Sequence, residues 1–209
     1  MATLLLRLAA PLQSWGSSSK FNIRTTEREP TKSGMIGMLA AALGIQRNDD
    51  PAKLEPLKKL NFGVGVLREG KLLKDFQMVH EMEKGDSHIT HRYYLSDAVF
   101  VAALESDDRE YLEKLAYAVQ NPIYPLFLGR RSCPPTVPVF MAIKEEGLYD
   151  FLSNKENGFG RIVFETDSGG IVVQDDPISF SQLHRQHGYR MIKEEIIYSS
   201  DEHDPMAEL

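Results

Sequence analysis

The order of the predicted secondary-structure elements is the feature that most limits what this chain can fold into. Over residues 1–143, strand-like apolar runs and helical segments follow one another as strand, helix, strand, strand, helix, strand. This order belongs to the split βαβ unit of ferredoxin-like, RRM-like folds. It predicts an α+β protein whose residues 1–143 form a ferredoxin-like βαββαβ palm.

Capping residues, glycines and prolines set the bounds of these elements. Two of the predicted strands are close enough in sequence to pair around a short Arg-Glu-Gly turn. The predicted elements are a strand at Thr3–Ala9, a helix at Pro30–Gly44 capped by Thr31 or Ser33, paired strands at Leu60–Leu67 and Lys71–Val79, a strand at Tyr93–Leu104, a helix between an Asp107/Glu110 capping box and Pro122, and a strand at Val137–Ile143.

The connection between the two middle strands of the palm is longer than a compact domain needs. From about Phe76 to Ala98 the chain is polar and charged, loop-like over His80–Arg92, with a turn candidate at Lys84-Gly85-Asp86. The flanking stretches KDFQMV and HRYYLSDAVF are strand-like. We therefore predict an extended β-hairpin at about 76–98 that reaches away from the palm, with a mobile surface loop as the alternative.

Residues 144–209 form the second predicted part of the chain, a small β-rich extension. The stretch GRIVFETDSGGIVV predicts a hairpin with a Ser-Gly-Gly turn, and GYRMIKEEIIYS predicts a last strand. An acidic tail follows, because Lys193–Leu209 contains one lysine against six carboxylates.

The charges of the chain are segregated along its length. Residues 1–47 carry six basic against two acidic residues, a balance of +4, whereas the whole chain has a formal net charge of −6. The remaining 162 residues therefore sum to −10. Two windows, Pro122–Lys144 and His184–Lys193, hold arginines and no carboxylates. A chain of this kind can present a basic groove on an acidic body.

Several function classes find little support in the sequence. No apolar run approaches the roughly 18 residues that span a bilayer, and the N-terminal apolar run is interrupted by Arg7, so we predict no membrane span and no signal peptide. The single cysteine, Cys133, fits a reducing cytoplasm and is expected to be a packed thiol. The histidines lack a zinc pattern, and PTKSG lacks the frame of a phosphate-binding loop, so no metal or cofactor is predicted.

Residue types suited to single-stranded RNA recur in the chain. Such binding uses cations for phosphates, aromatic rings for bases and backbone donors at tight turns. The stretch LGRRSCPP places Arg130 and Arg131 after a glycine, and Lys32 and Ser33 open a helix whose free N–H groups favour an anion. The plain alternative for each is a solvated surface residue.

Metal-free RNA cleavage is the enzymatic alternative. It requires a base near a 2′-hydroxyl group and a cation near the phosphate. The stretch between the middle strands contains residues of these types, namely His80, His91, Arg92, Tyr93 and Tyr94.

Four ordered stretches resemble the Cas-five family of CRISPR proteins, within the RAMP superfamily, and in particular its members in the type I-E surveillance complex Cascade. They are LRLAAPLQSWG, PTKSGMIGMLAAALGIQRND, RYYLSDAVFVAAL and YPLFLGRRSCPPTVPVF, and they cover about Leu4–Val139. The resemblance implies an RRM-like palm with a β-hairpin thumb in a non-catalytic subunit. Such a subunit holds the 5′ handle of the guide RNA in cytoplasmic antiviral defence, whereas a sister branch cleaves its precursor RNA.

The resemblance also implies partners and binding residues. The partners are the guide RNA, the backbone subunit CasC, the large subunit CasA and, through the complex, target DNA. Trp15 has a core position as its alternative, and Arg47 a solvated one. The residues to which the resemblance gives an RNA-binding role are Gln13, Trp15, Arg24, Lys32, Ser33, Arg47, Arg92, Arg130 and Arg131.

Overall fold

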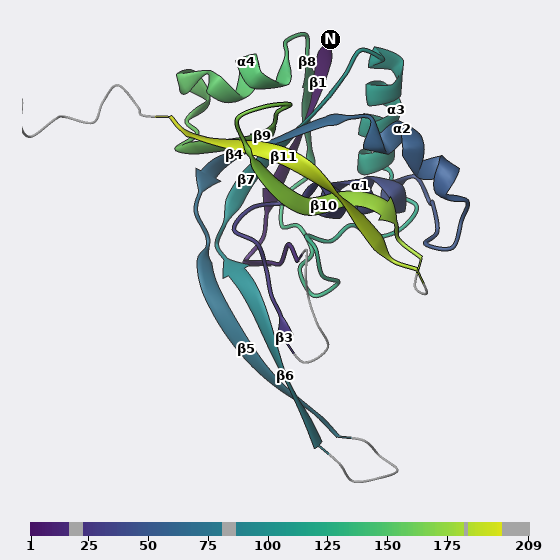
Figure 1. Cartoon of the computed structure of the whole chain (residues 1–209), viewed down its shortest axis with the longest axis vertical. Coiled ribbons are helices and arrows are strands. Elements are labelled where there is room, and N and C mark those ends of the chain that lie inside the picture. Colours follow the sequence, from purple (N-terminus) through teal and green to yellow (C-terminus); the bar gives the residue numbers. More distant parts are fainter. Residues whose placement is uncertain (17–22, 81–86, 182–183, 198–209) are drawn as a thin grey trace, which may run out of the picture.

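The computed structural model describes residues 1–16, 23–80, 87–181 and 184–197, apart from the side chains of residues 79–80 and 87–88. The fold is mixed α and β, and most strands join one seven-stranded sheet whose six junctions are all antiparallel (Figure 1). Across this sheet the strands are β10 (Ile171–Ser179), β11 (Gln186–Ile196), β9 (Arg161–Glu165), β4 (Asn61–Arg68), β7 (Val99–Ser106), β1 (Ala2–Ala9) and β8 (Phe140–Lys144).

Helices cover both faces of the large sheet. Leu4, Leu6 and Leu8 of β1 point to the face that packs against α1 (Lys32–Ala42) and α3 (Arg109–Gln120). Leu5 belongs to the core of the opposite face, beneath α4 (Leu148–Ser153). Because successive side chains of a strand alternate between faces, β1 is apolar on both sides and sits inside the protein. The remaining helical pieces are the short α2 (Glu55–Lys58) and 3₁₀ turns at Pro51–Leu54 and Lys155–Asn157.

The two main helices begin and end largely where capping chemistry predicts. Thr31 caps α1, its Oγ1 accepting a hydrogen bond of 3.2 Å from the amide of Gly34, and Gly44 follows the helix with a φ of 77°. The second cap lies one residue beyond the predicted Asp107: Asp108 is the N-cap of α3, accepting from the amide of Tyr111 at 2.9 Å.

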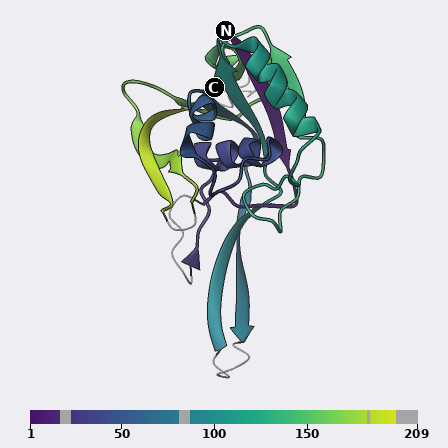
Figure 2. The same ribbon diagram turned by 90° about the vertical axis from the view of Figure 1, so that its right-hand side faces the viewer.

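A long hairpin projects from the body, at the end of the molecule opposite the N-terminus (Figures 1 and 2). It consists of β5 (Lys71–His80) and β6 (Ser87–Ser96), paired residue by residue from Lys71↔Ser96 to His80↔Ser87. The hairpin therefore starts earlier than predicted, and the described residues of the expected loop over His80–Arg92, namely 80 and 87–92, are strand. The turn candidate at residues 84–86 lies outside the described residues.

Short strands complete a second sheet at the base of this hairpin. β2 (Leu12–Gln13) pairs antiparallel with β6, and β3 (Ile23–Arg24) pairs parallel with it. The predicted strand at Tyr93–Leu104 is in fact two strands, because Asp97 takes a positive φ of 59° and separates β6 from β7.

Two predicted strand pairings are wrong, although the strands themselves exist. β4 and β5 belong to different sheets, and β11 lies between β9 and β10. In β4, residues 62–66 are buried on both faces. Such a strand belongs in the interior of a sheet, paired on both edges and covered on both faces, rather than in a projecting hairpin. Gly63 and Gly65 make that cover possible, since a Cβ there would lie within 2.7 Å of Leu152 and within 2.5 Å of Phe159.

Two further details differ from the prediction. The strand expected at Val137–Ile143 is β8, which begins at Phe140, after a stretch interrupted by prolines. The C-terminal part, expected to be β-rich, also contains α4. Its strands extend the large sheet through the pairing of β9 with β4.

Candidate nucleic-acid interface

The LGRRSCPP stretch forms a tight loop tied to the chain near Ser14. The amide of Leu128 donates to the carbonyl of Cys133 at 2.7 Å, and its carbonyl accepts from the amide of Ser14 at 3.2 Å. Gly129 has a φ of 86°, and a Cβ there would lie 1.7 Å from the Ser14 carbonyl oxygen. This glycine is therefore required by the fold itself, because it lets the loop rest on a neighbouring backbone.

Cys133 closes this loop as a packed thiol. Its side chain is buried, and burial is the main effect that raises the pKa of the thiol. The thiolate that a nucleophile needs is therefore disfavoured, which agrees with the packed thiol expected from the sequence.

Arg130 lies over an aromatic ring at the base of the hairpin. Its guanidinium carbon is 4.6 Å from the centre of the Tyr94 ring, and its NH2 group donates to the carbonyl of Arg24 at 2.9 Å. The NH1 group is buried and has no partner among the described residues. Arg131, the next residue, is exposed.

Arg24 and Arg92 are neighbours on adjacent strands. β3 and β6 run parallel with Arg24 opposite Arg92, so both side chains are on the same face of the small sheet. Tyr94, two residues after Arg92, shares that face and carries Arg130 above it. The structure thus brings Arg24, Arg92 and Arg130 together, and the exposed Arg131 follows in the same loop. We call these four residues the arginine junction.

Donors and acceptors without partners concentrate around the arginine junction. Five buried side-chain polar atoms of the described residues lack a hydrogen-bond partner, and three of them are here: Thr25 Oγ1, Arg92 Nε and Arg130 NH1. A fourth, His91 Nδ1, lies on the opposite face of β6, where the His91 ring contacts Phe76. Buried polar groups are normally satisfied, so such a concentration indicates a surface built to meet another molecule.

No carboxylate within the described ranges pairs with any arginine of the junction within 4.0 Å. The nearest register partner, Asp75 opposite Arg92 on β5, instead accepts a hydrogen bond of 2.8 Å from Gln77. Four cations without a carboxylate partner suit a run of phosphate groups.

Gln13 and Trp15 lie inside the fold. The Gln13 amide donates to the carbonyls of Leu8 and Ala98 at 3.2 and 2.9 Å, and its Oε1 accepts from the Trp15 indole at 3.1 Å. Both side chains are almost fully buried, as the core alternative for Trp15 expected. They hold the segment on which the Gly129 loop rests, so any contribution to binding is through positioning.

Lys32 and Ser33 are also buried, at the start of α1. The Lys32 amide, expected to be free for an anion, donates to a carboxylate oxygen of Asp175 at 2.9 Å. The ammonium group lies 2.9 Å from Glu165 and 4.0 Å from Asp176. The helix N-terminus therefore already faces a carboxylate of the same chain, and the burial of these residues gives no support to direct RNA contact.

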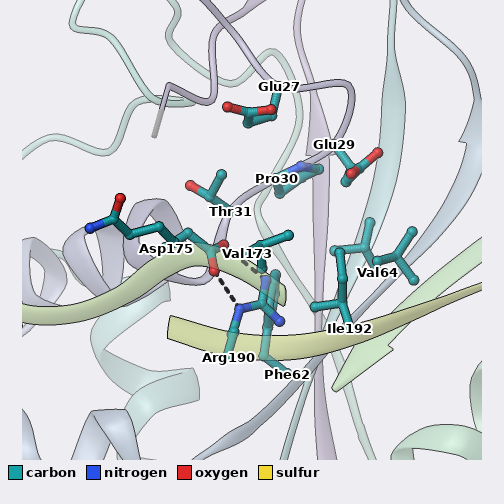
Figure 3. A pocket seen from close by; sticks show the side chains of 12 residues that line it. Glu27, Glu29, Pro30, Thr31, Phe62, Val64, Val173, Asp175, Arg190 and Ile192 are labelled. Carbon is teal, nitrogen blue, oxygen red and sulfur yellow. Dashed lines mark hydrogen bonds and ion pairs between the residues drawn. The ribbon is translucent and has the colours of Figure 1, made fainter. Parts of the chain in front are cut away.

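A cavity of about 180 Å³ lies beside this helix start (Figure 3). Arg190 lines it, held by two hydrogen bonds to Asp175 of 2.5 and 2.8 Å and lying 5.3 Å from the centre of the Phe62 ring. Glu27 and Glu29 line the other side. With three carboxylates and one paired arginine, this cavity does not suit a phosphate.

Arg161 completes a second group of basic residues, the ion-pair network, defined as Lys32, Arg161 and Arg190 with their carboxylates. Arg161 is buried and pairs with Glu29 at 3.0 Å and Glu69 at 2.8 Å. All three cations are thus matched by acids of the same chain.

Arg47 is the last of the predicted binding residues, and two further residues were not named by the sequence analysis. Arg47 is exposed beyond the end of α1, where its charge acts on Arg185. The sequence analysis did not name Thr25 or Arg185 as binding residues. Thr25 adjoins a predicted arginine, and Arg185 lies in the acid-free window 184–193, which is the one sequence feature that could have drawn attention to it.

The residues of the enzymatic alternative do not converge. His91 and Arg92 are consecutive in β6, so their side chains are on opposite faces of the hairpin. Tyr94 is buried on the Arg92 side, and Tyr93 shares the side of His91. A histidine base and its phosphate-binding arginine would therefore face away from each other. The side chain of His80 lies outside the described residues.

The family to which this fold and site belong is defined by comparison with known proteins. The family model described as CRISPR-associated protein (Cas_Cas5) matches residues 3–193, and the chain belongs to this family. Among curated proteins, the CRISPR system Cascade subunit CasD of Escherichia coli strain K12 is 37% identical over 156 residues, covering 66% of this chain and 69% of CasD.

Solved structures give the same relationship. A chain of a CRISPR RNA-guided surveillance complex matches with a TM-score of 0.77 and 30% identity, covering 93% of this chain and 90% of that one. A chain described as a crystal structure of a Cas protein matches with a TM-score of 0.72 and 35% identity, covering 93% and 94%. Separately, no helix in the described part of the chain is long and apolar enough to cross a membrane.

Proposed function

We propose that this chain is a non-catalytic RNA-binding subunit of a type I-E Cascade complex, which holds the 5′ handle of the guide RNA in antiviral defence. The observation that carries the proposal is the arginine junction, whose four arginines pair with no carboxylate of the described residues and whose surroundings hold three buried polar atoms without a described partner. The likeness to CasD and to a chain of an RNA-guided surveillance complex supports the same conclusion.

The proposed architecture is a ferredoxin-like palm of residues 1–143, a thumb and a C-terminal extension of residues 144–209. The order β8-β1-β7-β4 within the large sheet, with α1 and α3 on one face, supports the palm. The projecting β5–β6 hairpin supports the thumb, with the arginine junction at its base. In this arrangement the thumb passes over the RNA where guide–target pairing begins.

The proposed partners follow from membership of such a complex. The guide RNA is the direct ligand, CasC and CasA are the neighbouring protein subunits, and target DNA is reached through the assembly. The likeness to a Cascade subunit supports this set. We place the assembly in the cytoplasm, because its reducing conditions keep a single unpaired cysteine in the thiol form.

Processing of precursor guide RNA remains the second candidate function, since the residue types for it are present on β6. The opposite orientations of His91 and Arg92 argue against it. Incubating the purified protein alone with a repeat-containing RNA separates the two functions: we expect no cleavage. Metal-independent cutting at the handle boundary that disappears in His91→Ala would establish the nuclease instead.

The salt dependence of RNA binding tests the arginine junction. Each lost phosphate contact should flatten the log–log slope of affinity against salt by about 0.7 for a single strand. Arg130→Ala/Arg131→Ala should therefore lower the slope by up to about 1.4. Lys59→Ala/Lys114→Ala removes two exposed charges elsewhere and should leave it unchanged. An unchanged slope and affinity in the arginine variant would show that the loop is not on the RNA.

The thumb has its own test. Replacing residues 81–90 with a short Gly-Ser turn removes the distal part of the hairpin and leaves the arginine junction in place. We expect handle binding to fall modestly, and assembly with the backbone subunit or pairing at the first target bases to suffer most. A shortened protein that assembles and supports target binding like the parent would remove the thumb assignment.

A further inference from the structure

Thr25 holds one of the three unpartnered atoms at the arginine junction, although its side chain carries no charge. The residue directly follows β3, and its Oγ1 atom is buried without a hydrogen-bond partner among the described residues. The hydroxyl group of the next residue, Thr26, is used inside the fold: it accepts from the amide of Trp15 at 2.8 Å and donates to the carbonyl of Glu27 at 2.9 Å. Phosphate binding by arginines does not require the Thr25 hydroxyl, so this group calls for an explanation of its own.

Thr25 and Arg130 contact each other through their other polar atoms. The NH2 group of Arg130 donates to the carbonyl of Arg24 at 2.9 Å and lies 3.5 Å from the carbonyl oxygen of Thr25. The other terminal nitrogen of the same guanidinium group, NH1, is buried and has no described partner. Thr25 and Arg130 are each only partly buried as residues. The two unpartnered atoms therefore belong to residues in direct contact, and one group of a bound molecule can meet both.

The two atoms differ in the hydrogen bonds that they can form. A guanidinium nitrogen only donates, whereas a threonine hydroxyl both donates and accepts. A ribose 2′-hydroxyl has the same double capacity, so it can accept from NH1 of Arg130 and donate to Oγ1 of Thr25. A phosphate oxygen only accepts, and the exposed side chains of Arg24 and Arg131 already offer charged donors to phosphates. The neutral hydroxyl beside them fits the sugar of the same strand.

We propose that the Thr25 hydroxyl, together with NH1 of Arg130, binds a ribose 2′-hydroxyl of the guide RNA and makes the arginine junction selective for RNA over DNA. This inference rests on the proposed RNA-binding function and divides the roles within the site. The exposed arginines contact phosphates, which RNA and DNA share. Thr25 adds a contact that DNA cannot make.

Single 2′-deoxy substitutions along the handle RNA test the proposal on the full chain. Handle RNAs that each contain one 2′-deoxynucleotide are titrated by fluorescence anisotropy with the parent and with Thr25→Val, which keeps the shape of threonine but removes the hydroxyl. We expect Thr25→Val to weaken binding of the all-ribose handle by about two- to tenfold, as for the loss of one hydrogen bond. One deoxy position should weaken binding by the parent at least as much, and Thr25→Val should cause no further loss on that handle.

Two variants and one titration serve as controls. Thr25→Ser keeps the hydroxyl and should bind like the parent. Thr166→Val removes a hydroxyl that donates to the carbonyl of Ser168 at 2.9 Å, outside the junction, and should also bind like the parent. The salt slope of Thr25→Val should equal that of the parent, because no charge is lost.

The outcomes separate this inference from the proposed function. A parent that binds no handle RNA would remove the proposed function, and the 2′-hydroxyl contact with it. If the parent binds and Thr25→Val is unchanged, or is weakened equally on every deoxy handle, the 2′-hydroxyl contact is overturned and the proposed function stands. A marked fall in the melting temperature of Thr25→Val would also overturn it, because the hydroxyl would then be in use inside the fold.

Discussion

The arginine junction and the ion-pair network contain the same kinds of residue and use them in opposite ways. Arg130 lies on Tyr94, with an unpartnered NH1 group and no carboxylate of the described chain within 4.0 Å. Arg190 lies over Phe62, with both oxygens of Asp175 on its guanidinium group. Both arginines stand by a ring, yet one is matched by the chain and the other is not.

The difference shows how a chain with a net charge of −6 can bind a polyanion. Its carboxylates neutralise the basic residues that hold β10, β11 and α1 together, whereas no carboxylate of the described residues forms an ion pair with the arginines at the base of the hairpin. Local pairing, rather than net charge, decides which cations are available to phosphate.

Breaking the ion-pair network should give the largest effect on stability. Asp175→Ala leaves Arg190 and the Lys32 amide without their shared partner inside the fold, where Asp175 is almost fully buried. We expect a loss of about 3–5 kcal/mol in the free energy of unfolding, measured by denaturant titration. The salt slope of RNA binding by the folded protein should not change. A loss below about 1 kcal/mol would mean that the network contributes little.

Moving the arginine loop should affect binding strongly and stability less. Gly129→Ala places a Cβ against the Ser14 carbonyl and should displace Arg130 and Arg131. We expect a loss of more than about 1 kcal/mol in the free energy of unfolding and a flatter salt slope of RNA binding. The Cys133 thiol should also be labelled faster, because in the parent its burial raises the pKa of the thiol and a displaced loop exposes it.

Gly158→Ala is the matched control for that variant. Gly158 also has a positive φ, 72°, but a Cβ there has open space around it. It should show a similar backbone strain, with RNA binding and thiol labelling like the parent. If both glycine variants bind RNA like the parent, the loop position is not what presents the arginines.

Removing single arginines of the junction should give the reverse of Asp175→Ala. In Arg92→Gln the stability should stay within about 0.5 kcal/mol, because no ion pair is broken. The salt slope should fall by about 0.7. A large loss of stability with an unchanged salt slope would show that Arg92, like Arg190, stabilises the fold and does not contact RNA.

A charge-conserving change should give the smallest effect. Arg130→Lys keeps the positive charge but loses the planar group that lies on Tyr94 and donates to the Arg24 carbonyl. We expect the salt slope to be retained and the affinity to fall several-fold, as measured by fluorescence anisotropy. A slope as low as that of Arg130→Ala would show that geometry, not charge, makes the contact.

The sequence predicted local features better than distant ones. The Thr31 cap and Gly44 at the end of α1 depend on neighbouring residues and were confirmed. The partners of β4 and β9 were predicted wrongly, because the favoured short turns describe sequence neighbours, whereas burial on both faces places β4 inside the sheet.

The site divides in the same manner. Arginine-rich stretches are visible in the sequence, but Lys32 cannot be told from Arg130 without the carboxylates that meet it. Those carboxylates, on Glu165 and Asp175, lie 133 and 143 residues further along the chain. An ion pair between residues so far apart in the sequence can be identified only in the folded structure, where the sheet brings them together. The RNA contacts of the individual predicted residues stay predictions.

Ultraviolet crosslinking of handle RNA to the full chain, mapped by mass spectrometry of the peptides, tests the central claim most directly. The account predicts crosslinks in residues 23–26, 91–94 and 128–133, which form the arginine junction and its surroundings. It predicts none at Phe62, Arg161 or Arg190, whose surroundings are rich in carboxylates. Crosslinks concentrated at the ion-pair network, with the arginine junction unmodified, would contradict it.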